Sequence, residues 1–181
     1  MSLVDLASDL DTDKNTTHSY LPVYEEYLAS RKTSACHVLE LGVQTGSSLL
    51  LWQRYFPNAE VYGIDINLSK NKIDNESRIH IIEGDAYTES VTQQLCQRTY
   101  NVIIDDGPHS KESMMYLAKN YTSMLDKDGI LIIEDVQDIA WTDDIIKAFP
   151  EEYRNRISVL DRRHIKGRYD DILIILDLKS T

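Results

Sequence analysis

The sequence predicts an α/β domain built on a Rossmann-like sheet of seven strands, mostly parallel with one antiparallel strand, and with helices on both faces. Short apolar runs alternate with longer amphipathic stretches almost from end to end, a pattern typical of parallel strands joined by helical crossovers. A turn bearing two glycines follows the first apolar run. Only the polar segment 162–170 joins the last two runs, which are therefore expected to pair antiparallel.

The expected strands are short apolar runs, as is typical of strands buried on both faces. In chain order they cover 37–43, 61–66, 78–84, 100–106, 125–135, 157–161 and 171–178. The run 125–135 begins as a turn, and the last two runs form the antiparallel pair.

The expected helices lie before and between these strands. The first, 20–31, carries an aromatic and apolar stripe of Tyr20, Tyr24, Tyr27 and Leu28, and the next ends near Pro57. In chain order the helices cover 20–31, 47–56, 88–98, 110–125 and 141–149. The polar segment 67–78 is expected to be a loop or a single helical turn.

A length of 181 residues is enough for one core and short for two. We expect one domain over 1–181, with a cofactor-binding core at 36–178 and an N-terminal lid or helical segment at 1–35. No apolar run approaches the ~20 residues that span a bilayer, and the acidic start lacks the features of a signal peptide. The sequence thus predicts a cytoplasmic protein with no membrane partner and with two reduced, mostly buried cysteines, Cys36 and Cys96.

The formal net charge of −11 opposes binding to nucleic acid, because phosphate recognition needs a cationic surface. The one candidate basic cluster lies at 162–168, and we interpret it as a solvated hairpin. The charge favours a small substrate that is neutral or cationic, or that is held through a metal ion.

Polar residues follow the first three strands, where ligands bind in open α/β sheets. Gly42 and Gly46 frame the turn after the first strand, with a wider spacing than the G-x-G-x-x-G of dinucleotide-binding folds. Asp65 ends the second strand, where a carboxylate can accept ribose hydroxyls, and Asp85 follows the third, where it can accept from an adenine amine. Each residue alone is a common turn residue, but their order predicts a nucleoside cofactor.

Acidic residues follow the fourth and fifth strands. Asp106, Glu134 and Asp135 are expected to converge, because adjacent strand ends lie ~5 Å apart. Three carboxylates without a lysine or arginine partner would repel one another, so the pattern predicts a hard divalent cation such as Mg²⁺. His109 follows Asp106 by three residues and is the candidate general base. The alternatives are a turn histidine and solvated acids at helix starts.

The motifs E-L-G-V-Q-T-G, G-I-D-I, E-G-D and I-I-D-D-G resemble those of class I S-adenosylmethionine-dependent methyltransferases over residues 36–178. The fold expected from the apolar runs is also that of this class. The resemblance implies S-adenosylmethionine as the cofactor. It implies cofactor contacts at Glu40, Gly42, Gly46, Asp65, Asp85 and Asp105.

The segments I-I-D-D-G-P-H and L-I-I-E-D resemble more closely the metal-dependent O-methyltransferases of macrolide sugars, of the mycinamicin and macrocin type. These have I-D-D-G-S-H and V-I-E-D, so Pro108 replaces a serine. The resemblance implies metal ligation by Asp106, Glu134 and Asp135, with His109 as the base. The N-terminal T-D-K-N-T-T-H-S-Y also resembles this family. It implies that Asp13, Lys14, His18 and Tyr20 are lid or site residues, the alternative being a helix cap.

The expected function is O-methylation, with magnesium or another hard divalent cation, of a hydroxyl on a small molecule or sugar. A catechol-type O-methyltransferase is an alternative, although that type generally has a lysine in place of His109 and an Asp-Asn pair in place of Glu134-Asp135. A nicotinamide-dependent oxidoreductase is another, but it leaves the carboxylates unexplained. A non-catalytic binding module is a third class. Assembly into a homo-oligomer is compatible with the sequence.

Overall fold

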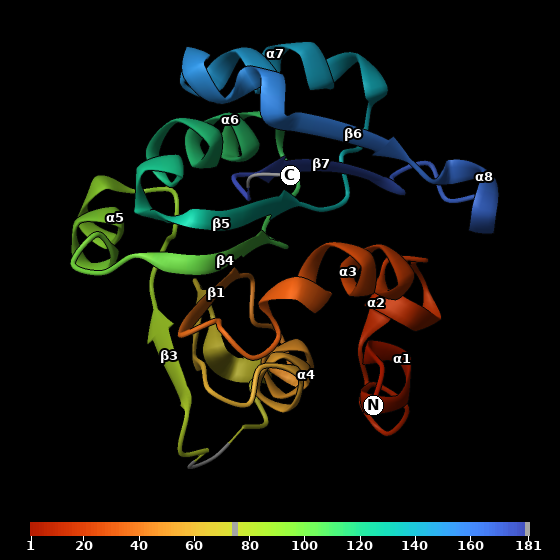
Figure 1. Ribbon diagram of the computed structural model, residues 1–181, viewed down its shortest axis with the longest axis vertical. Helices are drawn as coiled ribbons and strands as arrows, with labels where there is room; N and C mark the ends of the chain where they lie inside the picture. Colours follow the sequence, from red (N-terminus) through yellow and green to blue (C-terminus); the bar gives the residue numbers. More distant parts are fainter. Residues whose placement is uncertain (74–75, 180–181) are drawn as a thin grey trace.

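The computed structural model describes residues 1–73 and 76–179, which form one seven-stranded sheet with helices on both sides (Figure 1). The strand order is β3-β2-β1-β4-β5-β7-β6. The strands are β1 (His37–Leu41), β2 (Glu60–Asp65), β3 (Ile79–Glu83), β4 (Tyr100–Asp105), β5 (Leu125–Ile133), β6 (Ile157–Asp161) and β7 (Ile172–Asp177).

Strands β1 to β5 pair in parallel, and β7 pairs antiparallel with both β5 and β6. The predicted fold class and the predicted antiparallel pairing are therefore confirmed. The antiparallel strand lies inside the sheet, between β5 and β6, rather than at its edge. The carboxyl ends of β1 to β4 consequently share one edge of the sheet, as predicted.

Two groups of helices cover the two faces (Figure 1). On one side lie α1 (Leu3–Leu6), α2 (Asp13–Thr16), α3 (Leu21–Leu28) and α4 (Ser47–Tyr55). On the other side lie α5 (Glu89–Leu95), α6 (Lys111–Asn120) and α7 (Thr142–Ala148). The short α8 (Arg163–Lys166) connects β6 to β7. No helix within the described residues is long and apolar enough to cross a membrane.

Several helices are shorter than predicted, because 3-10 turns replace the α-helix at one end of the predicted range. The predicted helix 110–125 ends at Asn120 and continues as the 3-10 turn Thr122–Met124. The predicted helix 141–149 is the 3-10 turn Ile139–Trp141 followed by α7. The predicted loop 67–78 contains the 3-10 turn Leu68–Lys70, and its residues 74 and 75 lie outside the described residues. The expectation that Cys36 and Cys96 are mostly buried was wrong, because both side chains are exposed.

Side chains along each strand point alternately to the two faces of the sheet, which explains why helices cover both faces. In β4, Val102 and Ile104 pack against the side of α1, α3 and α4, whereas Ile103 packs against the side of α5, α6 and α7. All three side chains are fully buried. Successive residues of a strand point to opposite faces, so an almost uniformly apolar strand must be covered twice.

Residues 11–20 lie at the sheet edge where the parallel strands end, and the β6–β7 connection holds them. Lys166 donates to the carbonyls of Asn15, Thr16 and His18, and the Arg162 guanidinium donates to Ser19. The basic cluster at 162–168 is therefore not simply a solvated hairpin, as we interpreted it from the sequence. It binds the carbonyl groups of the N-terminal segment.

Candidate active site

A cavity of about 910 Å³ lies at the carboxyl ends of β1 to β4. The loops that follow these four strands line it, together with residues from the N-terminal segment. Lining residues from the N-terminal segment are Asp11, Thr12, Asp13, Thr16 and Thr17. This is where ligands bind in open α/β sheets, so the predicted position of the site coincides with the cavity.

The turn after β1 depends on glycine at Gly42. Its φ is +93°, and a Cβ atom there would lie 1.9 Å from the carbonyl oxygen of Asp106. The loop after β1 therefore packs directly against the loop after β4, which no side chain at position 42 would permit. Gly46 has a φ of +85° and caps α4. Gly42 lines the cavity, while Gly46 sets the direction in which α4 leaves it.

Asp65, at the end of β2, holds the glycine-bearing turn. Its carboxylate accepts hydrogen bonds of 2.9 Å from the backbone N–H groups of Val43 and Gln44, and another from Asn67. Burial raises the pKa of Asp65, but these backbone donors outweigh burial and hold the pKa below its ordinary value. Asp65 is thus an ionised residue of the cavity wall. Asp85 also lines the cavity and is exposed.

Glu40 and Asp105, both predicted cofactor contacts, lie behind the cavity wall rather than in it. Glu40 is fully buried and accepts a 2.6 Å hydrogen bond from the Ser48 hydroxyl. Asp105 is buried and accepts from the hydroxyl of Tyr87, which itself lines the cavity. Tyr87 is a cavity residue that the sequence analysis missed, although it follows Asp85 by only two positions.

Burial raises the pKa of Asp105 to about 6, although the hydrogen bond from Tyr87 acts in the opposite direction. The folded protein therefore holds the Asp105 proton more tightly than the unfolded chain, whose carboxyl has a pKa near 3.8. The stabilisation is complete below pH 3.8 and is lost as the pH rises through about 6.

We expect the Asp105→Asn variant, whose amide still accepts from Tyr87, to lack this pH dependence. The free energy of unfolding of the parent protein should fall, relative to that of the variant, by about 3 kcal/mol at most between pH 4 and pH 7. Urea unfolding of both proteins at a series of pH values measures this difference. A constant difference would show that Asp105 does not titrate in this range.

The three carboxylates predicted to bind a metal lie together, but a lysine lies among them. The Lys14 ammonium is 2.7 Å from both Asp106 Oδ2 and Glu134 Oε2, and 3.4 Å from Glu40. Burial lowers the pKa of Lys14, but these carboxylates outweigh burial and raise the pKa, so the lysine is charged. The sequence argument assumed that no lysine or arginine accompanies the carboxylates, and that assumption was wrong.

His109 faces two of the three predicted metal ligands, Asp106 and Asp135, from the cavity side. Its Nε2 is 3.7 Å from Asp106 Oδ1 and 3.6 Å from Asp135 Oδ2. The ligand atoms of these three residues lie within 4.8 Å of one another. Both His109 and Asp135 have positive φ angles, of +53° and +54°. Such angles are uncommon outside glycine and cluster at functional sites.

Glu134 differs from the other two carboxylates, because both of its oxygens already have donors. Lys14 donates to Oε2, and the buried Tyr24 hydroxyl donates to Oε1. Asp106 and Asp135 instead each have one oxygen that faces His109. Oxygen-rich sets of this kind suit hard divalent cations such as Mg²⁺ and Mn²⁺. The donor set at Asp106 and Asp135 therefore fits the predicted metal.

His18 and Tyr20 contact the same region from the N-terminal segment. The Tyr20 hydroxyl donates to Asp135 Oδ1 at 2.5 Å, and the two aromatic rings stack with centroids 4.8 Å apart. Burial and then the Asp135 charge raise the pKa of Tyr20, so the hydroxyl keeps its proton. His18 Nδ1 is 2.5 Å from Asp171 Oδ1 and 3.3 Å from Asp135 Oδ1.

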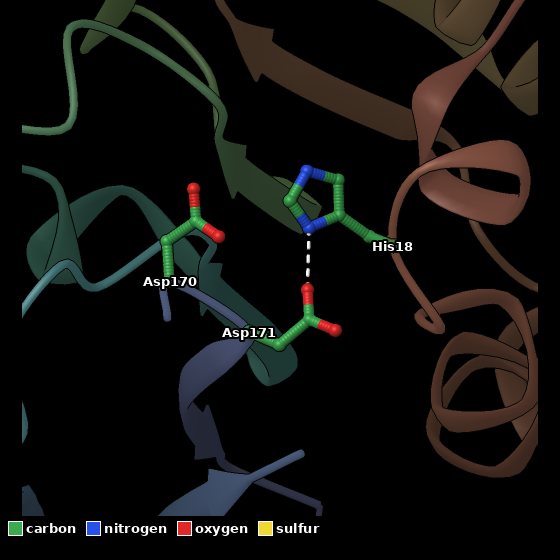
Figure 2. A group of neighbouring side chains, drawn as sticks. All are labelled: His18, Asp170 and Asp171. Carbon is green, nitrogen blue, oxygen red and sulfur yellow. Dashed lines mark hydrogen bonds and ion pairs between the residues drawn. The ribbon is translucent and has the colours of Figure 1, made fainter. Parts of the chain in front are cut away.

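Figure 2 shows His18 facing Asp171, with Asp170 beside them, a grouping with the residue types of a metal site. Its geometry is that of a hydrogen bond, because ligands that share one small cation lie ~3 Å apart and the His18–Asp171 distance is 2.5 Å. Arg168 also pairs with the Asp170 carboxylate, at 3.0 Å. The grouping anchors the N-terminal segment to the start of β7.

A family model described as a methyltransferase domain matches residues 39–136 of the chain, which contain most of β1, all of β2 to β5 and most of the cavity lining. Among curated proteins, an 8-demethyl-8-alpha-L-rhamnosyl tetracenomycin-C 2'-O-methyltransferase of Streptomyces olivaceus is 28% identical over 88% of this chain. A mycinamicin VI 2''-O-methyltransferase of Micromonospora griseorubida is 28% identical over 75% of this chain. The matches cover 44% and 36% of these relatives, so the chain spans less than half of their length.

A solved structure gives the same picture of the fold. MycE methyltransferase from the mycinamycin biosynthetic pathway, in complex with Mg, SAH and mycinamycin VI, superposes with a TM-score of 0.78 and 22% sequence identity. The superposition covers 98% of this chain and 54% of that one. Nearly the whole chain thus has a counterpart in that structure.

Proposed function

The chain belongs to the methyltransferase-domain family, and from that premise we propose that it transfers a methyl group from S-adenosylmethionine to a hydroxyl, with a divalent cation at the site. One observation carries the proposal. A large cavity at the strand ends adjoins Asp106, Asp135 and His109, and one oxygen of each carboxylate faces Nε2 of the histidine. Relatives named for O-methylation of rhamnosyl and mycinamicin substrates support a sugar hydroxyl as the acceptor.

The cavity residues fit the proposed cofactor. Gly42 leaves room beside the loop after β4, and Asp65 and Asp85 offer acceptors for ribose and adenine groups. Tyr87 adds an aromatic wall, which Asp105 holds from behind. Glu40 would act indirectly, because it is buried behind the turn that would contact the cofactor.

At the metal centre, we infer that Asp106 and Asp135 hold the cation through the oxygens that face His109. Glu134 would complete the predicted ligand set through Oε1 if Tyr24, its present donor there, gave way, while Lys14 kept its bond to Oε2. The bound cation would polarise the acceptor hydroxyl and lower its pKa.

His109 has the position of a general base. It borders both the cavity and the two carboxylates, so its imidazole can take the hydroxyl proton at Nε2. Asp106 and Asp135 then stabilise the imidazolium that forms. The cavity walls contribute by holding the acceptor oxygen in line with the methyl group, and such positioning is the main requirement of methyl transfer.

The histidine also separates this proposal from the catechol-type alternative. His109 borders the cavity and supports the role of base, whereas Lys14, the buried lysine, pairs with carboxylates that raise its pKa and keep it charged. A charged lysine cannot accept a proton. The sugar-type acceptor is therefore favoured over a catechol.

An assay of S-adenosylhomocysteine release tests the function. We expect release with rhamnosylated or other sugar-bearing acceptors when Mg²⁺ is present, and its loss in EDTA. Equal rates in EDTA would contradict the metal requirement. Release with catechols but with no sugar would contradict the proposed acceptor. A cytoplasmic location and assembly into a homo-oligomer stay predictions.

A further inference from the structure

The two carboxylates that face His109 are each contacted from two opposite directions. Asp106 accepts from Lys14 at Oδ2 and presents Oδ1 to His109. Asp135 accepts from Tyr20 at Oδ1 and presents Oδ2 to His109. In both cases a residue of the N-terminal segment donates a hydrogen bond to one carboxylate oxygen, and the other oxygen faces the cavity side.

Lys14 and Tyr20 are both buried behind the carboxylates. Lys14 is 1% exposed and Tyr20 is 0% exposed, and neither lines the cavity. A molecule bound in the cavity would therefore not contact them. Other residues of the same segment, including Thr12 and Thr16, do line the cavity. The segment thus has two separate surfaces, one toward the cavity and one toward the carboxylates.

The segment is held in place independently of these two contacts. Lys166 binds three of its carbonyls, and His18 is bonded to Asp171 at the start of β7 (Figure 2). Loss of the Tyr20 hydroxyl alone would leave those anchors unchanged. The donors at Asp106 and Asp135 are therefore fixed in direction by the rest of the fold.

Building on the proposed function, we propose that Lys14 and Tyr20 are positioning residues of the metal centre. Each donates to one oxygen of a carboxylate and so orients the other oxygen toward the cation. Groups that bond to ligating side chains in this way fix ligand orientation, and their removal typically weakens metal binding 10- to 100-fold. The Lys14 charge also reduces the repulsion among carboxylates that would otherwise push them apart.

The Tyr20→Phe variant tests the proposal, because it removes only the hydroxyl. We expect calorimetric titration with Mn²⁺ to give a dissociation constant about 10- to 100-fold above that of the parent chain. Affinity for S-adenosylhomocysteine should stay within about twofold. The matched control is Tyr55→Phe, which removes a hydroxyl from another fully buried tyrosine bonded to a carboxylate, at Glu25. The control should bind Mn²⁺ like the parent.

Lys14→Arg is a second variant that keeps the positive charge. A planar guanidinium cannot donate along the same directions as an ammonium, so we again expect weaker Mn²⁺ binding. A fall in affinity at constant charge reports on geometry, and it supports the proposal even if Tyr20→Phe fails to fold.

Three results would overturn the inference. Unchanged Mn²⁺ affinity in both variants would show that neither residue orients a ligand. A parallel loss of Mn²⁺ and S-adenosylhomocysteine affinity would show that the segment has merely loosened, since it also walls the cavity. If the parent chain itself bound no divalent cation, the metal-dependent function proposed above would fail first, and this inference with it.

Discussion

The Asp106→Asn variant is expected to lose most methyl transfer and its metal requirement together. Asparagine keeps the shape of the side chain but removes the charge that attracts the cation, and it leaves Lys14 with one carboxylate fewer. Loss of metal assistance is worth several kcal/mol of transition-state stabilisation, so we expect turnover to fall about 10³-fold. The residual rate should be the same in Mg²⁺ and in EDTA.

The matched control for this variant is Asp144→Asn. Asp144 is an aspartate of α7, on the other side of the sheet, and is likewise paired with a lysine, Lys111, at 2.5 Å. The control should keep full activity and full stimulation by Mg²⁺. An Asp106→Asn protein that was still stimulated by Mg²⁺ would show that the cation binds elsewhere.

The His109→Ala variant is expected to lower turnover by about 10²-fold or more, because it removes the proposed general base. Affinity for S-adenosylhomocysteine should be nearly unchanged, since Asp65 and Asp85, the proposed acceptors for adenosine, are untouched. Full activity in this variant would mean that another group takes the proton.

Position 109 has a left-handed backbone conformation, with a φ of +53°, which alanine adopts less readily than asparagine. His109→Asn therefore separates loss of the base from strain in the loop, and both variants should be equally slow. His80→Ala is the control. His80 lies on β3 at the edge of the sheet and pairs with Glu60 rather than with the site. It should retain the parent rate.

The sheet was predictable because short stretches of sequence determine its strands. Each apolar run, such as that around Val102 and Ile104, has to be covered on both faces, and each strand end bears the polar residues of the cavity edge. The missing helical crossover before β7 likewise predicted the antiparallel pairing correctly. Local patterns of this kind set strand direction without any knowledge of distant contacts.

Contacts between distant residues account for what the sequence analysis missed. Lys14 precedes Asp106 by 92 positions and Glu134 by 120, and no local pattern marks it as their counter-ion. The partnership of Asp105 with Tyr87 depends on how two loops pack, at Gly107, where a Cβ atom would meet the Tyr87 hydroxyl at 2.0 Å. Resemblance alone pointed to Lys14 and Tyr20, and it gave no indication of the atoms that they contact.

Calorimetric titration of S-adenosylhomocysteine into the purified protein, once with excess Mg²⁺ and once with EDTA, tests the central claim most directly. The account predicts binding in the micromolar range with Mg²⁺, and binding that persists in EDTA, because the cavity residues that would contact adenosine are separate from the carboxylates at the metal centre. Absence of binding in both conditions would contradict the assignment of the cavity to S-adenosylmethionine, and the carboxylates around Lys14 would then need a different explanation.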